Sequence, residues 1–247
     1  MAGRSRLDVL LVQRGLAESR EKAQAIIMAG SVVVDGRPAL KSGTPVAADV
    51  EIRVLAGPQY VSRGGEKLAH ALDTFALDVH GLTVIDAGAS SGGFTDCLLQ
   101  RGAARVYAVD VGRGQLDWRL RRDPRVVVME GVNVRYLESL PEKADLATID
   151  VSFISLEKVI PPVASLLKEG ARIVALVKPQ FQARREEVRR GGVVRDPQVH
   201  AGVLGRLIAW CAGRRLRLLG LTTSPLLGPA GNKEFFLLLG VPAEAHS

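Results

Sequence analysis

The chain has 247 residues, of which 47% are hydrophobic and 24% are charged, with a formal net charge of +7. This composition is typical of a globular protein with one main domain and a smaller second one. No run of about 18 uncharged apolar residues occurs, and the amino terminus has no signal-peptide core. We therefore expect a cytoplasmic protein with no membrane partner.

The first unit covers residues 4–55 and begins with two short apolar stripes at helical spacing. The first stripe ends at Gly15, and the second runs from Ser19, a good N-cap residue, to Gly30. These stripes predict two small helices. Strands are predicted to follow, because valines precede an Asp-Gly turn and because apolar and charged residues alternate over 49–54.

The sequence of this unit also follows a longer pattern. Starting at Leu7 it runs Leu-Asp-Val-Leu-Leu-Val-Gln-Arg-Gly-Leu-Ala-x-Ser-Arg-x-x-Ala-x-x-Ile-Ile-x-x-Gly-x-Val-x-Val-Asp-Gly. The pattern closely resembles the S4 RNA-binding domain, and the resemblance implies a helix pair that presents basic side chains to structured RNA. The implied RNA-binding residues are Arg4, Arg6, Arg20 and Lys22. Residues 56–60 have the composition of a short linker.

The second unit, 61–242, alternates strands and helices in the manner of an α/β domain with a doubly wound, mostly parallel sheet. Its predicted strands cover 83–86, 105–110, 126–130, 145–151, 172–177, 216–223 and 233–239. Its predicted helices cover about 63–76, 92–101, 156–167 and 198–214.

The most informative stretch is 83–96, where an apolar strand runs into a glycine-rich turn and then a helix. Gly88, Gly92 and Gly93 let the backbone come close to a ligand, and open α/β sheets bind ligands at such a turn. Ser90 stands where the second glycine of the dinucleotide fingerprint belongs, which argues against NAD. Close packing without any ligand is the alternative interpretation of these glycines.

The charge of two strand ends points to the cofactor. Asp86 is expected to face the loop, where a carboxylate would repel a pyrophosphate but suit a cationic cofactor such as S-adenosylmethionine. Asp110 ends the next strand, about 20 residues beyond the glycine turn, where an acid is expected to bind ribose hydroxyls. Asp110 suits either cofactor, so the choice depends on Asp86.

Four polar residues occupy positions that an ordinary structural domain does not favour. Lys67 lies near the start of the first helix, Asp150 and Lys178 follow apolar strands, and Glu234 begins the last strand. Strand carboxyl ends place Asp150 and Lys178 at the ligand-binding edge. Taken singly, each residue is compatible with a surface charge or a helix cap, so the argument depends on the set.

Three motifs accompany this order of lysine, aspartate, lysine and glutamate. They are Asp-x-Gly-x-Ser-x-Gly-Gly-Phe-Thr from Asp86, Ile-Asp-Val-Ser-Phe-Ile-Ser from Ile149 and Leu-Val-Lys-Pro-Gln-Phe from Leu176. The set resembles the ribose 2′-O-methyltransferases of the FtsJ class. With the S4-like unit, the chain from about residue 6 to 240 resembles the TlyA, or haemolysin A, family of ribosomal RNA cytidine 2′-O-methyltransferases.

This resemblance implies a Rossmann-like class I methyltransferase domain with a seven-stranded sheet, S-adenosylmethionine as cofactor, and ribosomal RNA or ribosomal subunits as partners. The implied catalytic residues are Lys67, Asp150, Lys178 and Glu234. The implied cofactor-binding residues are Asp86, Gly88, Ser90, Ser91, Gly92, Gly93, Phe94, Asp110, Asn133 and Asp150. We expect Lys178 either to orient the ribose hydroxyl or, if it is neutral, to deprotonate it, and the sequence leaves both roles open.

Positive charge gathers in one region, because residues 178–217 hold ten Lys or Arg against three acids. Within this region, 183–196 contains glycines and few apolar anchors, which predicts a mobile basic loop. Binding of a polyanion and a merely solvated charged face both remain open. The expected RNA-binding residues here are Arg184, Arg185, Arg189 and Arg190.

Other chemistries fit less well. Cys97 and Cys211 lie in apolar helical patterns, which predicts reduced core thiols rather than a disulfide, a zinc site or a nucleophile. The histidines show no ligand spacing, so no metal is expected. Asp150-Val-Ser-Phe153 lacks the two prolines of amino-methylating enzymes. The remaining alternatives are an inert methyltransferase fold that binds RNA during ribosome assembly and a haemolysin-like membrane-active protein.

Overall fold

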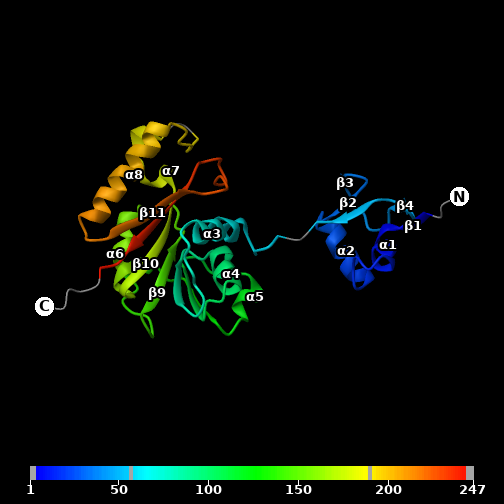
Figure 1. The fold of residues 1–247 in the computed structure, drawn as a ribbon, viewed down its shortest axis with the longest axis horizontal. Helices are drawn as coiled ribbons and strands as arrows, with labels where there is room; N and C mark the ends of the chain where they lie inside the picture. The colour runs from blue at the N-terminus through cyan, green and yellow to red at the C-terminus, as the bar shows by residue number, and fades with distance from the viewer. Residues whose placement is uncertain (1–3, 56–57, 189–190, 243–247) are drawn as a thin grey trace. The chain divides into compact units, whose positions relative to one another are not determined.

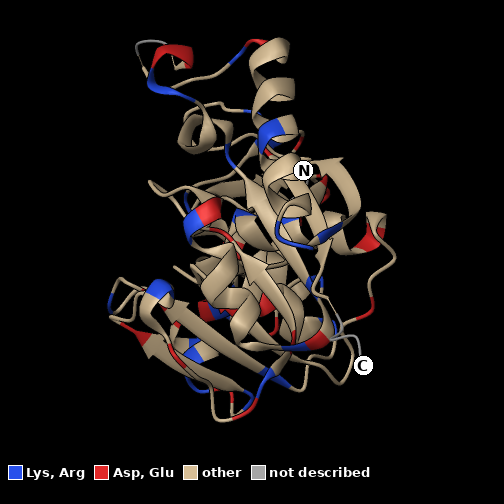
Figure 2. Cartoon of the chain, turned by 90° about the vertical axis from the view of Figure 1, so that its left-hand side faces the viewer, with Lys and Arg blue, Asp and Glu red and all other residues tan. Residues whose placement is uncertain are grey.

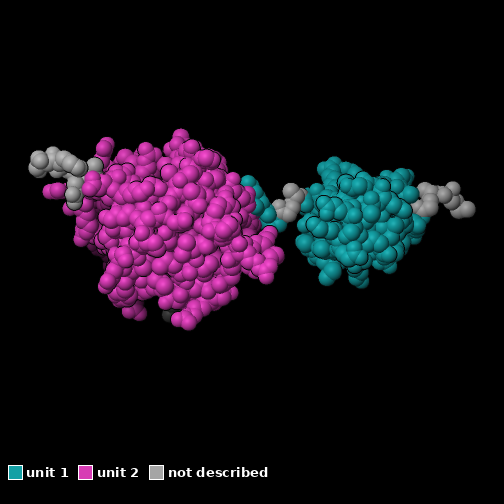
Figure 3. Space-filling model, turned by 90° about the horizontal axis from the view of Figure 1, so that it is seen from below, with its two compact units in different colours: residues 1–59 teal, residues 60–247 magenta. Residues whose placement is uncertain are grey.

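The structure is a computed structural model that describes residues 4–55, 58–188 and 191–242. The chain forms two compact units, residues 1–59 and 60–247 (Figure 1, Figure 3). Of the predicted linker 56–60, residues 56 and 57 lie outside the described residues. Tyr60 is buried in the core of the second unit, so the linker ends before it.

The first unit packs a helix pair against short strands. Its elements are β1 (Arg4–Arg6), α1 (Leu7–Gln13), α2 (Arg20–Met28), β2 (Val32–Val34), β3 (Arg37–Pro38), β4 (Pro45–Ala47) and β5 (Ile52–Val54). Strand β1 pairs with β4, and β3, β2 and β5 form a second sheet in that order. The Ser19 hydroxyl accepts the Lys22 N–H at 3.2 Å and caps α2, as the sequence predicts.

The second unit is built on one seven-stranded sheet. Its strands are β6 (Thr83–Ala87), β7 (Arg105–Asp110), β8 (Val126–Glu130), β9 (Ala144–Ile149), β10 (Leu167–Val177), β11 (Arg217–Thr223) and β12 (Phe235–Gly240). Its α-helices are α3 (Arg63–Thr74), α4 (Gly93–Gln100), α5 (Trp118–Arg121), α6 (Ile160–Ser165), α7 (Pro179–Gln182) and α8 (Pro197–Ala212). Short 3-10 turns form η1 (Val134–Tyr136), η2 (Leu156–Lys158) and η3 (Arg185–Glu187).

The strand order is β11-β12-β10-β9-β6-β7-β8. Neighbours from β10 to β8 are parallel, whereas β12 runs antiparallel to both β10 and β11. The predicted seven-stranded, mostly parallel sheet of a class I methyltransferase is therefore confirmed.

Alternate residues of each strand send their side chains into two separate cores. On β10, Val174 and Leu176 join the core that includes α3 and α4. Ile173, Ala175 and Val177 join the opposite core, which includes α6 and α8. Because helices cover both faces of the sheet (Figure 1), its strand ends are the places open to a ligand.

Two predictions of secondary structure, a helix at 156–167 and the start of the strand at 172, were wrong. The pattern at 156–167 is not one helix, because η2 ends before α6 begins and α6 carries Pro161 and Pro162 in its first turn. Proline lacks the N–H that would continue a helix from the preceding turn. Strand β10 begins at Leu167 instead of 172, and its register with β9 shifts between Leu167 and Arg172. No described helix has the length and apolarity needed to cross a membrane.

Candidate active site

The four predicted catalytic residues meet at one edge of the sheet. Asp150 follows β9 and Lys178 follows β10, and these parallel strands end side by side. Glu234 precedes β12, whose first residue pairs with the last residue of β10, so an antiparallel strand brings it to the same edge. Lys67 reaches this edge from α3, and all four residues line one cavity of about 450 Å³.

Two ion pairs organise these four side chains. The Lys178 ammonium lies 2.5 Å from Oδ1 of Asp150 and donates to the Ser152 hydroxyl at 3.0 Å. The Lys67 ammonium donates to Oε2 of Glu234 at 2.6 Å. The charges of these four side chains balance each other, and Arg63 adds a third cation to the lining of the cavity.

The Lys67–Glu234 pair is the more deeply buried of the two. Lys67 is 7% exposed and Glu234 is 1% exposed, so each charge depends on its partner. Within the described residues, Oε1 of Glu234 has no hydrogen-bond partner although it is buried. Buried polar atoms are usually paired, so this oxygen is an acceptor that a ligand is able to satisfy.

The glycine-rich turn between β6 and α4 lies against the same edge. The loop residues that line the cavity are Gly88, Ala89, Ser90, Ser91, Gly93 and Phe94. Gly88 and Gly92 have φ values of +90° and +95°. A Cβ on Gly88 would lie 2.3 Å from the carbonyl oxygen of Asp150, and one on Gly92 would lie 2.2 Å from a leucine of α5. These glycines are therefore needed for packing within the protein, in addition to any role in ligand approach.

A second cavity of about 500 Å³ adjoins the first, and Gly88, Ser90 and Asp150 line both. Asp110 and Asn133 contribute polar groups to it, and the Asp110 carboxylate accepts the Ser90 N–H at 2.8 Å. Its apolar wall includes Val109, Val111, Val132, Val134, Val151, Phe153, Ile154 and Val159. An apolar cavity with a few convergent polar groups is the usual form of a small-molecule site.

Asp86 does not face the loop, contrary to the sequence-based expectation. Its side chain is fully buried, and its carboxylate accepts the Thr95 hydroxyl at 2.7 Å and the Thr148 hydroxyl at 3.0 Å. Burial raises the pKa of Asp86 to about 6. Asp86 lines neither cavity, and its hydrogen bonds join β6 to α4 and β9 from the inside.

In the first unit, the predicted RNA-binding cations lie at exposed positions. Arg6 and Arg20 converge on the fully buried carboxylate of Asp8, at 2.8 and 3.4 Å. Hydrogen bonding from Arg6 holds the pKa of Asp8 far below its usual range. The Lys22 ammonium lies 3.7 Å from the Glu18 carboxylate, in an exposed ion pair. A buried acid thus fixes two of the arginines at the start of the helix pair.

The basic stretch of the second unit contains a short helical turn, η3. Arg184 and Arg185 are exposed, whereas Arg189 and Arg190 lie outside the described residues. Figure 2 shows acidic and basic residues together in this part of the chain, and Arg206 pairs with Glu187 at 2.7 Å. In the described part of the segment, one helical turn and one ion pair accompany the exposed arginines.

The structure also contains supporting residues that sequence reasoning missed. Asn232 is 1% exposed, accepts the Val194 N–H at 2.9 Å and donates to the Gly192 carbonyl at 3.0 Å. It thereby joins the end of the basic stretch to the loop that carries Glu234. Glu130 accepts the Gly114 N–H at 3.0 Å and shapes the loop beside the second cavity. Asn232 stands between a glycine and a charged residue, a signal too common in loops to have revealed its role.

Both cysteines are buried free thiols, as predicted. Burial raises the pKa of Cys97 and that of Cys211 to about 11, so neither resembles an activated nucleophile. Across the described ranges, no group of three or more His, Cys, Asp or Glu side chains is arranged to hold a metal ion.

The comparisons with known proteins define the class. Residues 60–241 match the FtsJ-like methyltransferase family, and residues 5–52 match the S4 domain. The chain therefore belongs to the FtsJ-like methyltransferase family and carries an S4 domain ahead of the catalytic domain, which confirms the resemblance found in the sequence.

Particular relatives are similar along nearly the whole chain. One is a candidate rRNA methyltransferase of Bacillus subtilis, YqxC, with 51% identity over 250 residues, 98% of this chain and 88% of that protein. Another is the 16S/23S rRNA (cytidine-2'-O)-methyltransferase TlyA of Mycobacterium tuberculosis, with 48% identity over 247 residues, 97% of this chain and 91% of that protein. A solved structure of a candidate hemolysin from Streptococcus thermophilus is 43% identical, with a TM-score of 0.74, and the similarity covers 100% of this chain and 92% of that one.

Proposed function

We propose that the protein uses S-adenosylmethionine to methylate the ribose 2′-hydroxyl of a cytidine in ribosomal RNA. One observation carries the proposal: the Lys178–Asp150 and Lys67–Glu234 ion pairs line a single cavity together with the glycine-rich turn. The TlyA relative from Mycobacterium tuberculosis is named for this reaction, which supports the choice of substrate. Ribosomal RNA or ribosomal subunits would be the partners, without a membrane or a metal, and the protein would act in the cytoplasm.

The adjoining cavities fit the size and polarity of S-adenosylmethionine. When bound, this cofactor supplies a methyl group on a sulfonium sulfur. Asp110 would hold ribose hydroxyls, Asn133 and the valine wall would surround the adenine, and the loop at Gly88 would lie beside the amino-acid portion. The unpaired Oε1 of Glu234 is a buried acceptor at the other end of the first cavity.

Lys178 has the contacts needed to orient a hydroxyl. A ribose hydroxyl is a weak nucleophile, so it must be aimed at the methyl carbon and its proton must leave. An ammonium has three donors, and here one reaches Ser152 while the charge lies beside the Asp150 carboxylate. A remaining donor would reach the ribose oxygen, with water accepting the proton. This arrangement favours orientation over deprotonation by Lys178.

Phe153 supplies a surface for a base beside this lysine. It follows Ser152, is 89% exposed and has a φ of +62°. A phenylalanine with a left-handed backbone conformation and an exposed ring costs conformational free energy, and such residues are typical of functional sites. Unpaired RNA bases stack on such aromatic rings, so we assign Phe153 to the base of the target nucleotide.

The proposal is tested by incubating the protein with radiolabelled S-adenosylmethionine and separated small subunits, large subunits or free ribosomal RNA, followed by digestion to nucleosides. We expect label in 2′-O-methylcytidine. Label on a base would contradict the assignment of the site, and no label on any substrate would favour an RNA-binding protein with an inert fold. Release of dye from liposomes by the protein alone would instead support a membrane-active role.

The role of Lys178 is tested separately by two substitutions. Lys178→Ala should abolish methyl transfer, while calorimetry still detects cofactor binding. Lys178→Arg keeps a permanent cation, so an orienting role predicts residual turnover that a required base would not allow. Turnover at the wild-type rate in Lys178→Ala would exclude both roles.

A further inference from the structure

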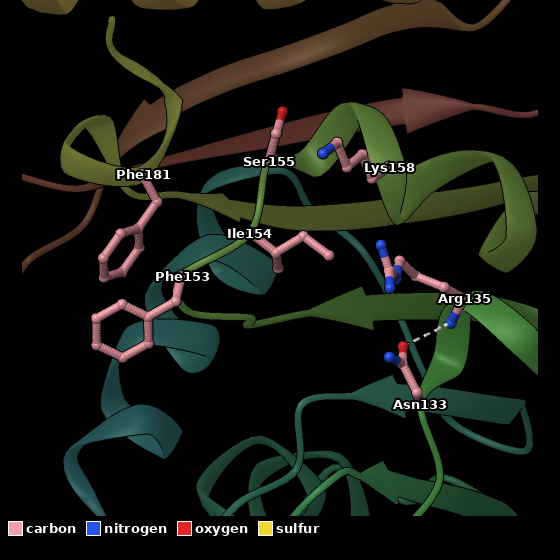
Figure 4. A pocket seen from close by; sticks show the side chains of 7 residues that line it. All are labelled: Asn133, Arg135, Phe153, Ile154, Ser155, Lys158 and Phe181. Atoms are coloured by element: carbon pink, nitrogen blue, oxygen red, sulfur yellow. Dashed lines mark hydrogen bonds between the residues drawn. The ribbon is translucent and has the colours of Figure 1, made fainter. Parts of the chain in front are cut away.

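A third cavity lies beside the proposed active site and has not been assigned a role so far. It measures about 560 Å³ and is lined by Asn133, Arg135, Phe153, Ile154, Ser155, Lys158 and Phe181 (Figure 4). Asn133, Phe153 and Ile154 also line the cavity assigned to the adenosine. The third cavity therefore opens at the same edge of the sheet as Lys178, next to the position proposed for the target nucleotide.

The two ends of this cavity differ in chemistry. At one end, the rings of Phe153 and Phe181 lie 4.8 Å apart between centroids. At the other, Figure 4 shows the charged ends of Arg135 and Lys158 directed into the same space, with Ile154 between them and the rings. Aromatic rings beside a cationic pocket are the pattern by which proteins hold a base and its neighbouring phosphate.

The positive charge of this cavity is uncompensated. The lining contains no carboxylate, and within residues 4–55, 58–188 and 191–242 neither Arg135 nor Lys158 forms an ion pair. Arg135 donates to the Tyr136 hydroxyl at 2.8 Å, but its Nε is buried without a partner in the described part of the chain. Two cations that share a cavity repel each other, and a bound anion removes that repulsion.

We propose that Arg135 and Lys158 form a phosphate subsite that binds an RNA backbone phosphate adjacent to the target nucleotide. This inference rests on the proposed function. S-adenosylmethionine carries no phosphate, and its carboxylate is assigned to the Gly88 loop, which does not line the third cavity. The cation pair is therefore assigned to the RNA. A planar guanidinium and a flexible ammonium together suit a phosphodiester, because the first fixes its orientation and the second adds charge. The subsite would position the ribose in front of Lys178.

The test compares Arg135→Gln, Lys158→Gln and the double variant with wild type. Lys143→Gln is the matched control, because Lys143 is an exposed lysine just before β9, at the opposite end of the strand from Asp150. Binding of labelled ribosomal RNA is measured with S-adenosylhomocysteine present, at several salt concentrations, and the KM for RNA and for S-adenosylmethionine are measured separately. Arg135→Lys tests whether charge alone restores binding.

We expect each glutamine variant to weaken RNA binding about tenfold. The slope of log K against log salt should fall by about 0.7 to 0.9 for each lost phosphate contact. Cofactor affinity and the melting temperature should stay at the values of Lys143→Gln. Arg135→Lys should keep the salt slope of wild type but bind less tightly, since it retains charge without the planar fork.

An unchanged salt slope in both glutamine variants, with normal RNA binding, would overturn the subsite. A rise in the KM for S-adenosylmethionine with unchanged RNA binding would overturn it as well, because the cavity would then serve the cofactor. If wild type methylates no RNA, the proposed function fails. The measurements of RNA binding would still show whether these two cations hold an RNA phosphate.

Discussion

The buried carboxylate of Asp86 gives a prediction that separates a structural role from cofactor binding. Burial raises the pKa of Asp86 to about 6, whereas an exposed aspartate in the unfolded chain has a pKa of 3.8. Between these pH values the native protein holds a proton that the unfolded chain has lost. The contribution of Asp86 to stability is therefore fully present below pH 3.8 and is lost as pH rises through about 6.

The size of this effect follows from the two pKa values. A separation of about two pH units corresponds to about 3 kcal/mol, at about 1.4 kcal/mol per unit. Asp86→Asn has nearly the same shape and cannot ionise. Relative to wild type, this variant should gain about 3 kcal/mol in the free energy of unfolding between pH 4 and pH 7.

The assay is urea denaturation at fixed pH values, followed by tryptophan fluorescence. Both tryptophans, Trp118 and Trp210, belong to the second unit, so the signal reports the domain that contains Asp86. Asp123→Asn is the control, because hydrogen bonding from Arg125 lowers the pKa of Asp123 below its unfolded value of 3.8. Its difference in stability from wild type should therefore change mainly as pH falls below 3.8 and stay nearly constant from pH 5 to pH 7. Calorimetry should show S-adenosylmethionine affinity unchanged in Asp86→Asn.

A difference between wild type and Asp86→Asn that stays constant from pH 4 to pH 7 would refute this reasoning. So would a large loss of cofactor affinity in a variant whose stability matches wild type. The first result would mean that Asp86 ionises normally in the folded protein. The second would return Asp86 to the cofactor site that the sequence suggested.

Three further predictions concern the contacts around the cavity. Glu234→Gln leaves the Lys67 ammonium buried without a carboxylate, so the free energy of unfolding should fall by about 3 to 5 kcal/mol in thermal denaturation. Adding Lys67→Met to this variant should largely reverse the loss. If the double variant is no more stable than the single one, the broken ion pair is not the cause. Gly88→Ala places a Cβ against the Asp150 carbonyl, and it should reduce S-adenosylmethionine affinity at least tenfold by calorimetry; normal affinity would show that the loop adjusts. Asn232→Ala removes two hydrogen bonds, so the melting temperature should fall by an amount equivalent to about 2 kcal/mol. The variant should also lower kcat by a larger factor than it changes the KM for S-adenosylmethionine. A kcat equal to that of wild type would show that Asn232 does not position Glu234.

The sequence by itself determined the architecture of both units. Apolar runs bounded by glycine and charged residues marked the strands and most long helices of the second unit, because strand and helix periods depend on local spacing. The capping serine and the two glycine stops did the same for the helix pair in the first unit. The sequence also placed Asp150 and Lys178 after predicted strands of a mostly parallel sheet, whose carboxyl edge is the ligand-binding edge.

Only the tertiary structure decided the partners of each charged group. The Lys67–Glu234 pair joins residues 167 positions apart, and no local pattern contains that contact. The direction of Asp86 was also beyond local reasoning, because two threonines from α4 and β9 provide the hydrogen bonds that allow a carboxyl group to stay buried. The physical reason is the same in both cases: backbone spacing fixes which residues share an element, whereas burial and long-range pairing fix what each side chain faces.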